Sequence, residues 1–291
     1  MDTNIISVDV EDYFQVQAFA GMIHRDSWSA YPSRVEQNTE RLLDLFGELS
    51  VKGTFFILGW VADHFPHLVR RIVEQGHEPA CHSYWHRLIY DLTPDQFRRD
   101  TLRAKDAIEQ AAGVRIYGYR APSFSITPRS TWALNILREL GFLYDSSLYP
   151  IRHDVYGFPD APRFPFRLET SVGDLLEFPL ATFRSPTGGI LPVAGGGYLR
   201  MLPRWYTRAG INRAWREGLP VVSYVHPWEL DADQPRLNGP LRSRLRHYTN
   251  LSRTDSRLRA LLALGRFTSF ERSGLASFPA RPQLQTAGFA S

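Results

Sequence analysis

Residues 54–86 read TFFILGWVADHFPHLVRRIVEQGHEPACHSYWH. The stretch begins with a continuous apolar run, Thr54 to Leu58, of the kind that forms a strand buried on both faces of a parallel sheet. Apolar residues at helical spacing follow from about Phe65 to Gln75, and Gly76 ends this predicted helix. A second short strand, Glu78 to Cys81, leads directly into two histidines four residues apart. The stretch therefore predicts a strand–helix–strand unit whose second strand ends in side chains that can do chemistry.

The same alternation of strand-like and helix-like stretches runs through most of the chain. Further strands are predicted at residues 5–10, 116–119, 175–178 and 221–225, and helices at 34–49, 93–112, 127–141 and 203–217. Thr93-Pro94 and Thr127-Pro128 are helix-start signals, a threonine N-cap followed by proline at the first helical position. The alternation predicts an α/β fold with parallel strands and crossover helices, either a barrel or an open sheet. In a barrel, the polar side chains that follow the strands converge at one end.

The length of 291 residues suits one large domain, since α/β barrels commonly reach this size as a single unit. Hydrophobic residues make up 43%, which is ordinary for a globular protein with a sizeable core. No apolar run approaches the roughly 18 residues that span a bilayer. The first residues, Met1 to Asn4, lack the basic and apolar regions of a secretory signal, so a cytoplasmic protein is expected. The single cysteine, Cys81, excludes an internal disulfide framework.

Basic residues are almost all arginine: only Lys52 and Lys105 are lysine, so 34 minus 2 leaves 32 arginines. Arginines are dense between residues 236 and 272. We therefore separate a basic C-terminal extension, residues 236–291, from a domain of residues 1–235, on which it packs or from which it trails. Such a segment suits a membrane surface or an anionic polymer, although a solvated helix face is the simpler interpretation. It has no aromatic stacking pattern or nucleic-acid motif, so nucleic acid is not an expected partner.

Two histidines, His82 and His86, follow the second strand of the opening stretch. Their spacing brings two imidazole nitrogens close enough to share a divalent metal at roughly 2.0–2.1 Å. A third ligand is available from the N-terminal run SVDVED, which ends in three carboxylates, Asp9, Glu11 and Asp12. Two histidines and one carboxylate leave coordination positions open, as in a catalytic metal site. A chance histidine pair, with aspartates that serve only a turn or a helix cap, is the alternative.

Three more polar groups lie just after predicted elements. Arg120 stands at a strand end in YRAPSFS, before a rigid proline turn. Asp145 opens an Asp-Ser-Ser sequence after a predicted helix. His226 ends a valine-rich strand and is followed by proline. Each has a structural alternative, such as an ion pair or a capped strand end, but together with the paired histidines they indicate one catalytic site.

His-Ser-x-x-His, Arg-x-Pro and a strand ending in His-Pro, in this order, resemble the polysaccharide deacetylase family, also called the NodB-homology or carbohydrate esterase family 4 group. The resemblance spans about residues 5–231. The octapeptide SVDVEDYF is similar, more narrowly, to the branch associated with bacterial exopolysaccharide and exosortase loci. The resemblance implies a distorted (β/α) barrel of the NodB-homology type in a single domain. It also implies a metal-dependent hydrolase that removes N-acetyl groups from sugars of an exopolysaccharide or its precursor, with metal-bound water as nucleophile.

The resemblance also implies a role for each matched residue. Asp9 matches the general base, and His226 matches the histidine that acts as general acid. Arg120 is similar to the arginine that holds the base carboxylate, and Asp145 more loosely matches a residue that orients the acid histidine.

For the metal, the resemblance implies His82 and His86 as ligands of a divalent cation, expected to be Zn²⁺. Much of the family has two adjacent aspartates where this chain has Asp9, then Glu11 and Asp12. We expect Asp12 to be the carboxylate ligand, because a short side chain after a strand-end bulge can turn toward the metal. Glu11 is the alternative, because it shares a strand face with Asp9.

The expected substrate is an N-acetylated poly- or oligosaccharide. Candidate substrate-binding residues are Trp85, Pro122, Ser146 and Trp228, with aromatic rings stacking on sugars and a backbone N–H near Ser146 facing the developing oxyanion. Two alternatives stay open. The same chemistry can serve a non-sugar cyclic amide, and the fold can serve as a glycan-binding module without catalysis.

Overall fold

The computed structural model describes residues 4–153, 155–193 and 195–274. Most strands belong to one sheet, which comprises β1 (Asn4–Val10), β2 (Thr54–Ile57), β3 (Glu78–Cys81), β4 (Gly118–Tyr119), β5 (Tyr144–Asp145), β6 (Phe166–Thr170), β7 (Gly173–Glu177), β10 (Val222–Val225) and β11 (Phe267–Thr268). A separate hairpin pairs β8 (Thr182–Arg184) with β9 (Ile190–Pro192). The strands predicted at residues 5–10, 54–58, 78–81 and 221–225 are confirmed within one residue at each end.

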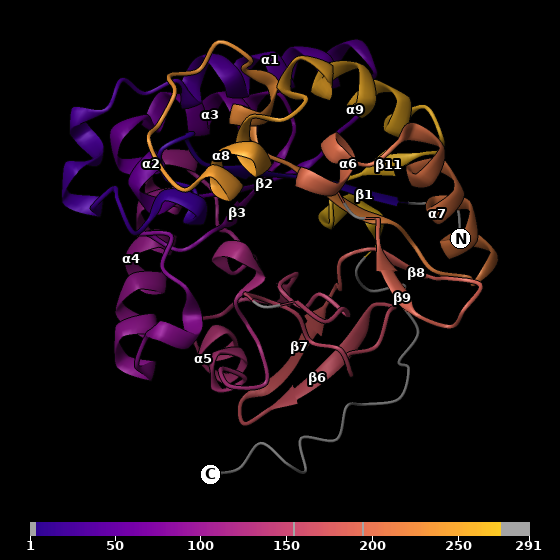
Figure 1. Ribbon diagram of the computed structural model, residues 1–291. Coiled ribbons are helices and arrows are strands. Elements are labelled where there is room, and N and C mark those ends of the chain that lie inside the picture. Colours follow the sequence, from indigo (N-terminus) through magenta and orange to yellow (C-terminus); the bar gives the residue numbers. More distant parts are fainter. Residues whose placement is uncertain (1–3, 154, 194, 275–291) are drawn as a thin grey trace.

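Helices surround the sheet strands as an outer layer (Figure 1). They are α1 (Val35–Glu48), α2 (Gly59–His64), α3 (Pro66–Glu74), α4 (Pro94–Ala112), α5 (Trp132–Glu139), α6 (Gly196–Met201), α7 (Arg204–Arg216), α8 (Leu241–Tyr248) and α9 (Thr254–Leu262). Thr93 is the N-cap of α4, as predicted, and forms a capping box with Gln96. The predicted start of α5 at Thr127-Pro128 is wrong, because the Ser130 hydroxyl accepts the Thr127 N–H in a turn that precedes the helix. None of the described helices is long and apolar enough to cross a membrane.

The sheet curls into a distorted barrel, as expected. Its strand order is β10-β1-β2-β3-β4-β5-β7-β6, and every neighbouring pair is parallel except β6 and β7. Between β7 and β10 the ring is completed by irregular chain. The N–H of Ala181 donates to the carbonyl of Val222 at 3.1 Å, and Gly195 forms a bridge to Tyr224. Parallel strands in one ring bring their carboxyl ends, and the polar side chains that follow them, to the same end of the barrel.

Residues 267–271, near the end of the described part of the chain, belong to this architecture. Strand β11 pairs with β1, with Asn4 opposite Phe267. Just beyond it, the ring of Phe270 stacks on Tyr144 and contacts Phe56 and Phe178 edge-on. The first residues of β2 and β3 bind this segment, since Thr54 accepts the N–H of Phe270 and Glu78 that of Glu271. Residues 267–271 therefore pack on the barrel and close its amino-terminal end, whereas residues 275–291 of the predicted extension lie outside the described residues. The division at residues 235 and 236 stays a prediction.

A buried histidine at this end of the barrel makes stability sensitive to acid. His77 packs against Phe55, and its Nδ1 accepts the N–H of Gly53 at 3.1 Å. Burial, together with the nearby Lys52 and Arg272, lowers the pKa of His77 to about 4. The unfolded chain, with an ordinary pKa near ~6.5, binds this proton first, so stability is lost as the pH falls from that value toward 4. We expect His77 to account for about 2 kcal/mol of the free energy of unfolding lost between pH 7 and pH 5.

Urea unfolding of the native chain and of a His77→Gln variant, each at pH 7 and at pH 5, measures how much of the lost free energy of unfolding depends on His77. The glutamine oxygen can still accept the Gly53 N–H but does not titrate, so the pH dependence of the variant should be shallower. Equal pH dependence in the two proteins would contradict the assignment.

Candidate metal and catalytic site

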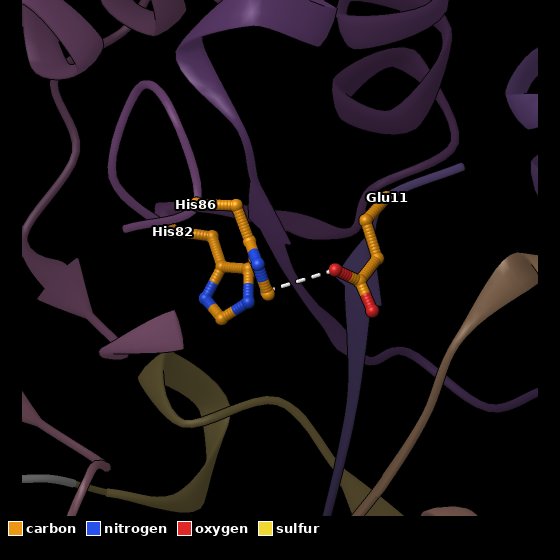
Figure 2. Close-up of side chains that lie close together, drawn as sticks. All are labelled: Glu11, His82 and His86. Atoms are coloured by element: carbon orange, nitrogen blue, oxygen red, sulfur yellow. Dashed lines mark ion pairs between the residues drawn. The ribbon is translucent and has the colours of Figure 1, made fainter. Parts of the chain in front are cut away.

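Three side chains that follow β1 and β3, the two strands on either side of β2, face one another at the carboxyl end of the barrel. Glu11 follows β1, and His82 and His86 follow β3. One ligand atom from each lies within 4.8 Å of the others, and all three residues are buried. Figure 2 shows the two imidazoles beside each other with the Glu11 carboxylate pointing toward them. Nε2 of His86 lies 2.9 Å from Oε2 of Glu11.

The protonation states of this cluster suit a cation. His82 donates its Nδ1–H to the carbonyl of Arg120 at 2.8 Å, which leaves the Nε2 lone pair free for a ligand. Burial lowers the pKa of His82 to about 4, so the imidazole is neutral near pH 7. Burial raises the pKa of Glu11, but His86 and His226 outweigh it and lower this pKa to about 2. Two imidazole nitrogens and one carboxylate, buried together, fit a divalent metal.

Asp12 does not join this cluster, and our preference for it over Glu11 is corrected. Its Oδ2 accepts hydrogen bonds from the Ser33 hydroxyl at 2.6 Å and from the backbone N–H groups of Arg34 and Val35 at 2.8 and 3.1 Å. Its Oδ1 accepts the N–H of Tyr13. The carboxylate thus serves the unpaired donors at the start of α1, which is a capping role.

The loop that carries the histidines has an unusual backbone. Ser83 and His86 have φ of +65° and +50°, in the left-handed region that non-glycine residues rarely adopt. Arg25 holds this loop from outside: its Nε donates to the carbonyl of Trp85 at 2.6 Å and its Nη2 to that of His86 at 3.2 Å. Sequence reasoning missed Arg25, since nothing in the residues around it indicates a partner some 60 positions away.

Asp9 and Arg120 form a buried ion pair beside the cluster. Nη1 of Arg120 lies 2.7 Å from Oδ1 of Asp9 and also donates to the Ser7 hydroxyl. The other guanidinium nitrogens donate to the backbone and hydroxyl oxygens of Ser146, and the group lies 4.2 Å from the ring centre of Phe56. Held by these hydrogen bonds inside the barrel, the Arg120 guanidinium fixes the position of the Asp9 carboxylate.

His226, at the end of β10, faces the same carboxylates. Its Nε2 lies 3.3 Å from Oε1 of Glu11 and 4.0 Å from Oδ2 of Asp9. On the other side, its Nδ1 lies 2.5 Å from Oε1 of Glu229, which in turn pairs with the buried Arg200. Burial lowers the pKa of His226, but Glu11, Glu229 and Asp9 outweigh it and raise this pKa to about 9. The imidazole is therefore charged near pH 7 and can donate a proton.

The carboxylate that orients His226 is Glu229, and the prediction of Asp145 for this role is wrong. Asp145 accepts the hydroxyl of Ser147 at 2.6 Å and stands opposite Glu177 in the pairing of β5 with β7. Burial raises the pKa values of both acids, that of Asp145 to about 6, so one of the pair is protonated near pH 7. Glu229 stands three residues after His226, and this capping-box spacing is the signal that could have identified it.

The predicted substrate-binding residues differ in how deeply they are buried. Trp85 is half-buried and packs against Trp28, and Pro122 is buried at the turn after β4. Ser146 is fully buried and its N–H donates to the Tyr119 carbonyl, so the idea that this N–H faces substrate is wrong.

Trp228 is buried, stacks on His226, and donates from Nε1 to Oε1 of Glu11 at 3.3 Å. These contacts support the side chains of the site from behind. The tryptophan therefore orients Glu11 and His226 and does not form an exposed wall for sugars.

Two family models match consecutive parts of the chain. Residues 26–144 match the model described as Polysaccharide deacetylase, and residues 146–274 match the one described as Domain of unknown function (DUF3473). The two matches meet within β5, so both contribute strands to the same barrel. The first covers the paired histidines and Arg120, and the second covers His226 and Glu229.

Curated relatives align over short stretches. Peptidoglycan-N-acetylglucosamine deacetylase of Bacillus cereus is 33% identical over 75 residues, which are 26% of this chain and 27% of that protein. Peptidoglycan deacetylase-like protein FGM2 of Gibberella zeae is 33% identical over 123 residues, 41% of this chain and 35% of that protein. The aligned part thus spans about a third or less of these relatives.

Solved structures resemble the whole fold. A protein from Mycobacterium smegmatis assigned to the polysaccharide deacetylases has a TM-score of 0.65 at 21% identity and covers 97% of this chain and 94% of its own. Puue allantoinase has a TM-score of 0.62 at 16% identity and covers 96% and 92%. These structures share the NodB-type barrel fold with this chain. Residues 26–144 therefore form a region that matches the polysaccharide deacetylase family model, and residues 146–274 form a region of the same barrel that matches the DUF3473 model.

Proposed function

We propose that this protein is a metal-dependent hydrolase that removes N-acetyl groups from sugars of an exopolysaccharide or its precursor. One observation carries the proposal: Asp9 and His226, an acceptor and a donor of protons, lie beside the buried cluster of Glu11, His82 and His86. The family motifs indicated Asp9, His82, His86 and His226 from the sequence, and Glu11 was the alternative to Asp12. The deacetylase names of the Bacillus cereus and Gibberella zeae relatives support the reaction class.

Glu11, His82 and His86 would hold the metal. When bound, a divalent cation polarises a carbonyl as a Lewis acid and makes water more acidic near neutral pH. The donor set suits Zn²⁺ and other divalent ions of the first transition row, and we propose Zn²⁺.

Hydrolysis of an N-acetyl group adds water across the C–N bond, releases acetate and leaves an amine. The Asp9 carboxylate, held in place by Arg120, accepts a proton from the attacking water. His226, charged and held by Glu229, gives its Nε2 proton to the departing nitrogen. The amine thus leaves neutral, and the two proton transfers balance.

The test is acetate release from N-acetylglucosamine oligomers. The full chain is stripped with a chelator, reconstituted with Zn²⁺, and assayed in both states. We expect one equivalent of metal and release of acetate only in the reconstituted protein. If reconstituted protein binds metal but releases no acetate from any N-acetylated sugar, the proposed substrate class is wrong.

A second candidate substrate is a cyclic amide. The observation that favours this second candidate is the fold similarity to Puue allantoinase, with a TM-score of 0.62. That enzyme has the same type of barrel. Turnover of cyclic imides without acetate release would establish this alternative. A protein that binds neither metal nor any amide substrate but retains sugar oligomers would instead be a glycan-binding module.

Arg25 should matter for metal binding, although its side chain contacts only backbone carbonyls of the loop that carries the histidines. An Arg25→Ala variant loses the two hydrogen bonds that hold the carbonyls of Trp85 and His86. Since supports of this kind are typically worth about 10–100-fold in metal affinity, we expect the Kd for Zn²⁺ to rise at least tenfold. Competition with a chromogenic chelator measures the change.

The matched control is Arg98→Ala, which removes only an exposed ion pair with Glu139 on the outer helices. This variant should bind Zn²⁺ as the native protein does. An unchanged Kd in Arg25→Ala would mean that the loop keeps its shape without the guanidinium.

A further inference from the structure

Helix α8 lies in a segment that carries only positive charge. From Gln234 to Thr254 the sequence has five arginines and no aspartate or glutamate. Three of them, Arg242, Arg244 and Arg246, are on α8, and all three are exposed. Concentrated charge of one sign on a surface attracts polyanions or anionic lipid.

The same helix exposes large apolar side chains. Leu241 and Leu245, one turn apart, are 69% and 57% exposed within the described residues. They lie on the side away from His247, the buried residue of the helix. Met22, which is 44% exposed, places its terminal methyl against Gly239 at the start of the segment and extends the apolar surface. Leucines on the outward face flanked by arginines are typical of helices that lie in a membrane interface.

This helix is attached to the active site. Its inner residue, His247, stacks on Trp228 with ring centres 4.1 Å apart and an interplanar angle of 13°. Trp228 in turn stacks on His226 and donates to Glu11. The outer face of α8 and the catalytic histidine are therefore separated by only two aromatic rings. A surface that binds α8 therefore lies close to His226.

We propose that α8 docks this protein on an anionic membrane surface, with Leu241 and Leu245 inserted among the lipids and Arg242 and Arg246 on the phosphates. If the proposed function holds, on which this consequence rests, the site meets saccharide that is presented at the membrane. An anionic polymer would explain the arginines but leaves the exposed leucines without a role. Lipid accounts for both.

Co-sedimentation of the full chain with vesicles tests the docking. Vesicles of phosphatidylcholine with about a third phosphatidylglycerol should bind the native protein, and vesicles of phosphatidylcholine alone should bind it at least tenfold more weakly. Each arginine near an anionic surface is worth about fivefold, so Arg242→Gln/Arg246→Gln should weaken binding about 30-fold. Leu241→Ser/Leu245→Ser should weaken it at least tenfold.

The control is Leu102→Ser, which removes a 44% exposed leucine from α4 and should bind vesicles as the native protein does. Two results would overturn the proposal. The first is that the native chain does not bind vesicles at physiological salt. The second is that the leucine variant binds vesicles as well as the native chain does, which would point to purely electrostatic attachment. Acetate release from soluble oligomers should be unchanged in the leucine variant. A failed activity assay and a failed vesicle assay are therefore separate results.

Discussion

A Glu11→Gln variant is expected to lose metal and activity together. Glutamine keeps the volume of the side chain and its contact with Trp228 Nε1, but it replaces the only carboxylate of the cluster with a neutral amide. A catalytic metal contributes several kcal/mol, and 4 kcal/mol corresponds to about 10³-fold in rate. We therefore expect kcat/KM to fall about 10³-fold and the Zn²⁺ content to fall well below one equivalent after dialysis.

Asp12→Asn is the matched control, since it removes a carboxylate one position away. This variant should keep its metal and its activity, and it should lose about 1–2 kcal/mol of stability, because one oxygen that caps α1 becomes an NH₂ group. Metal analysis and urea unfolding of both variants decide the question. Loss of metal in Asp12→Asn with retention in Glu11→Gln would restore Asp12 as the ligand.

The second large effect is expected at His226. A His226→Ala variant loses the proton donor, and general acid catalysis is typically worth about 10²–10⁴-fold, so kcat/KM should fall by that factor. Metal should stay bound, because His226 is outside the cluster of Glu11, His82 and His86. Glu229 keeps its ion pair with Arg200, so the truncation leaves no unpaired buried charge and the variant should fold.

Acetate release and metal content are measured on the same preparations. His24→Ala, which truncates an exposed histidine, controls for nonspecific effects and should behave as the native protein. More than a tenth of the native activity in His226→Ala would show that another group protonates the leaving nitrogen.

The parts of the fold that sequence predicted are those with clear local periodicity. The continuous apolar run of β2 and the capping box of α4 decide their structures by themselves. The start of α5 was misplaced because Thr127-Pro128 suits a turn as well as a helix start, and Ser130 decides between them. Strand β11 was missed because a two-residue strand has no periodicity, and its pairing depends on a partner at the other end of the chain.

The sequence predicted those site residues whose type and spacing along the chain have few structural explanations other than a functional site. The paired histidines and His226 came together as expected. The choice between Glu11 and Asp12 was not decidable locally, because Asp12 is occupied by the start of a helix more than twenty residues away. The partner of Asp145 is likewise set by the pairing of β5 with β7, which no local pattern encodes.

The pairing of β11 with β1 constrains when the molecule can assemble. Asn4 stands opposite Phe267, so 267 minus 4, or 263 residues, separate the two partners along the chain. During synthesis β1 is translated long before β11, so the positions of Asn4 and Ile5 that pair with β11 wait for their partner until nearly all of the described polypeptide has been translated. The barrel therefore closes after translation of its last strands, and nascent chains that stop short display an apolar edge to chaperones.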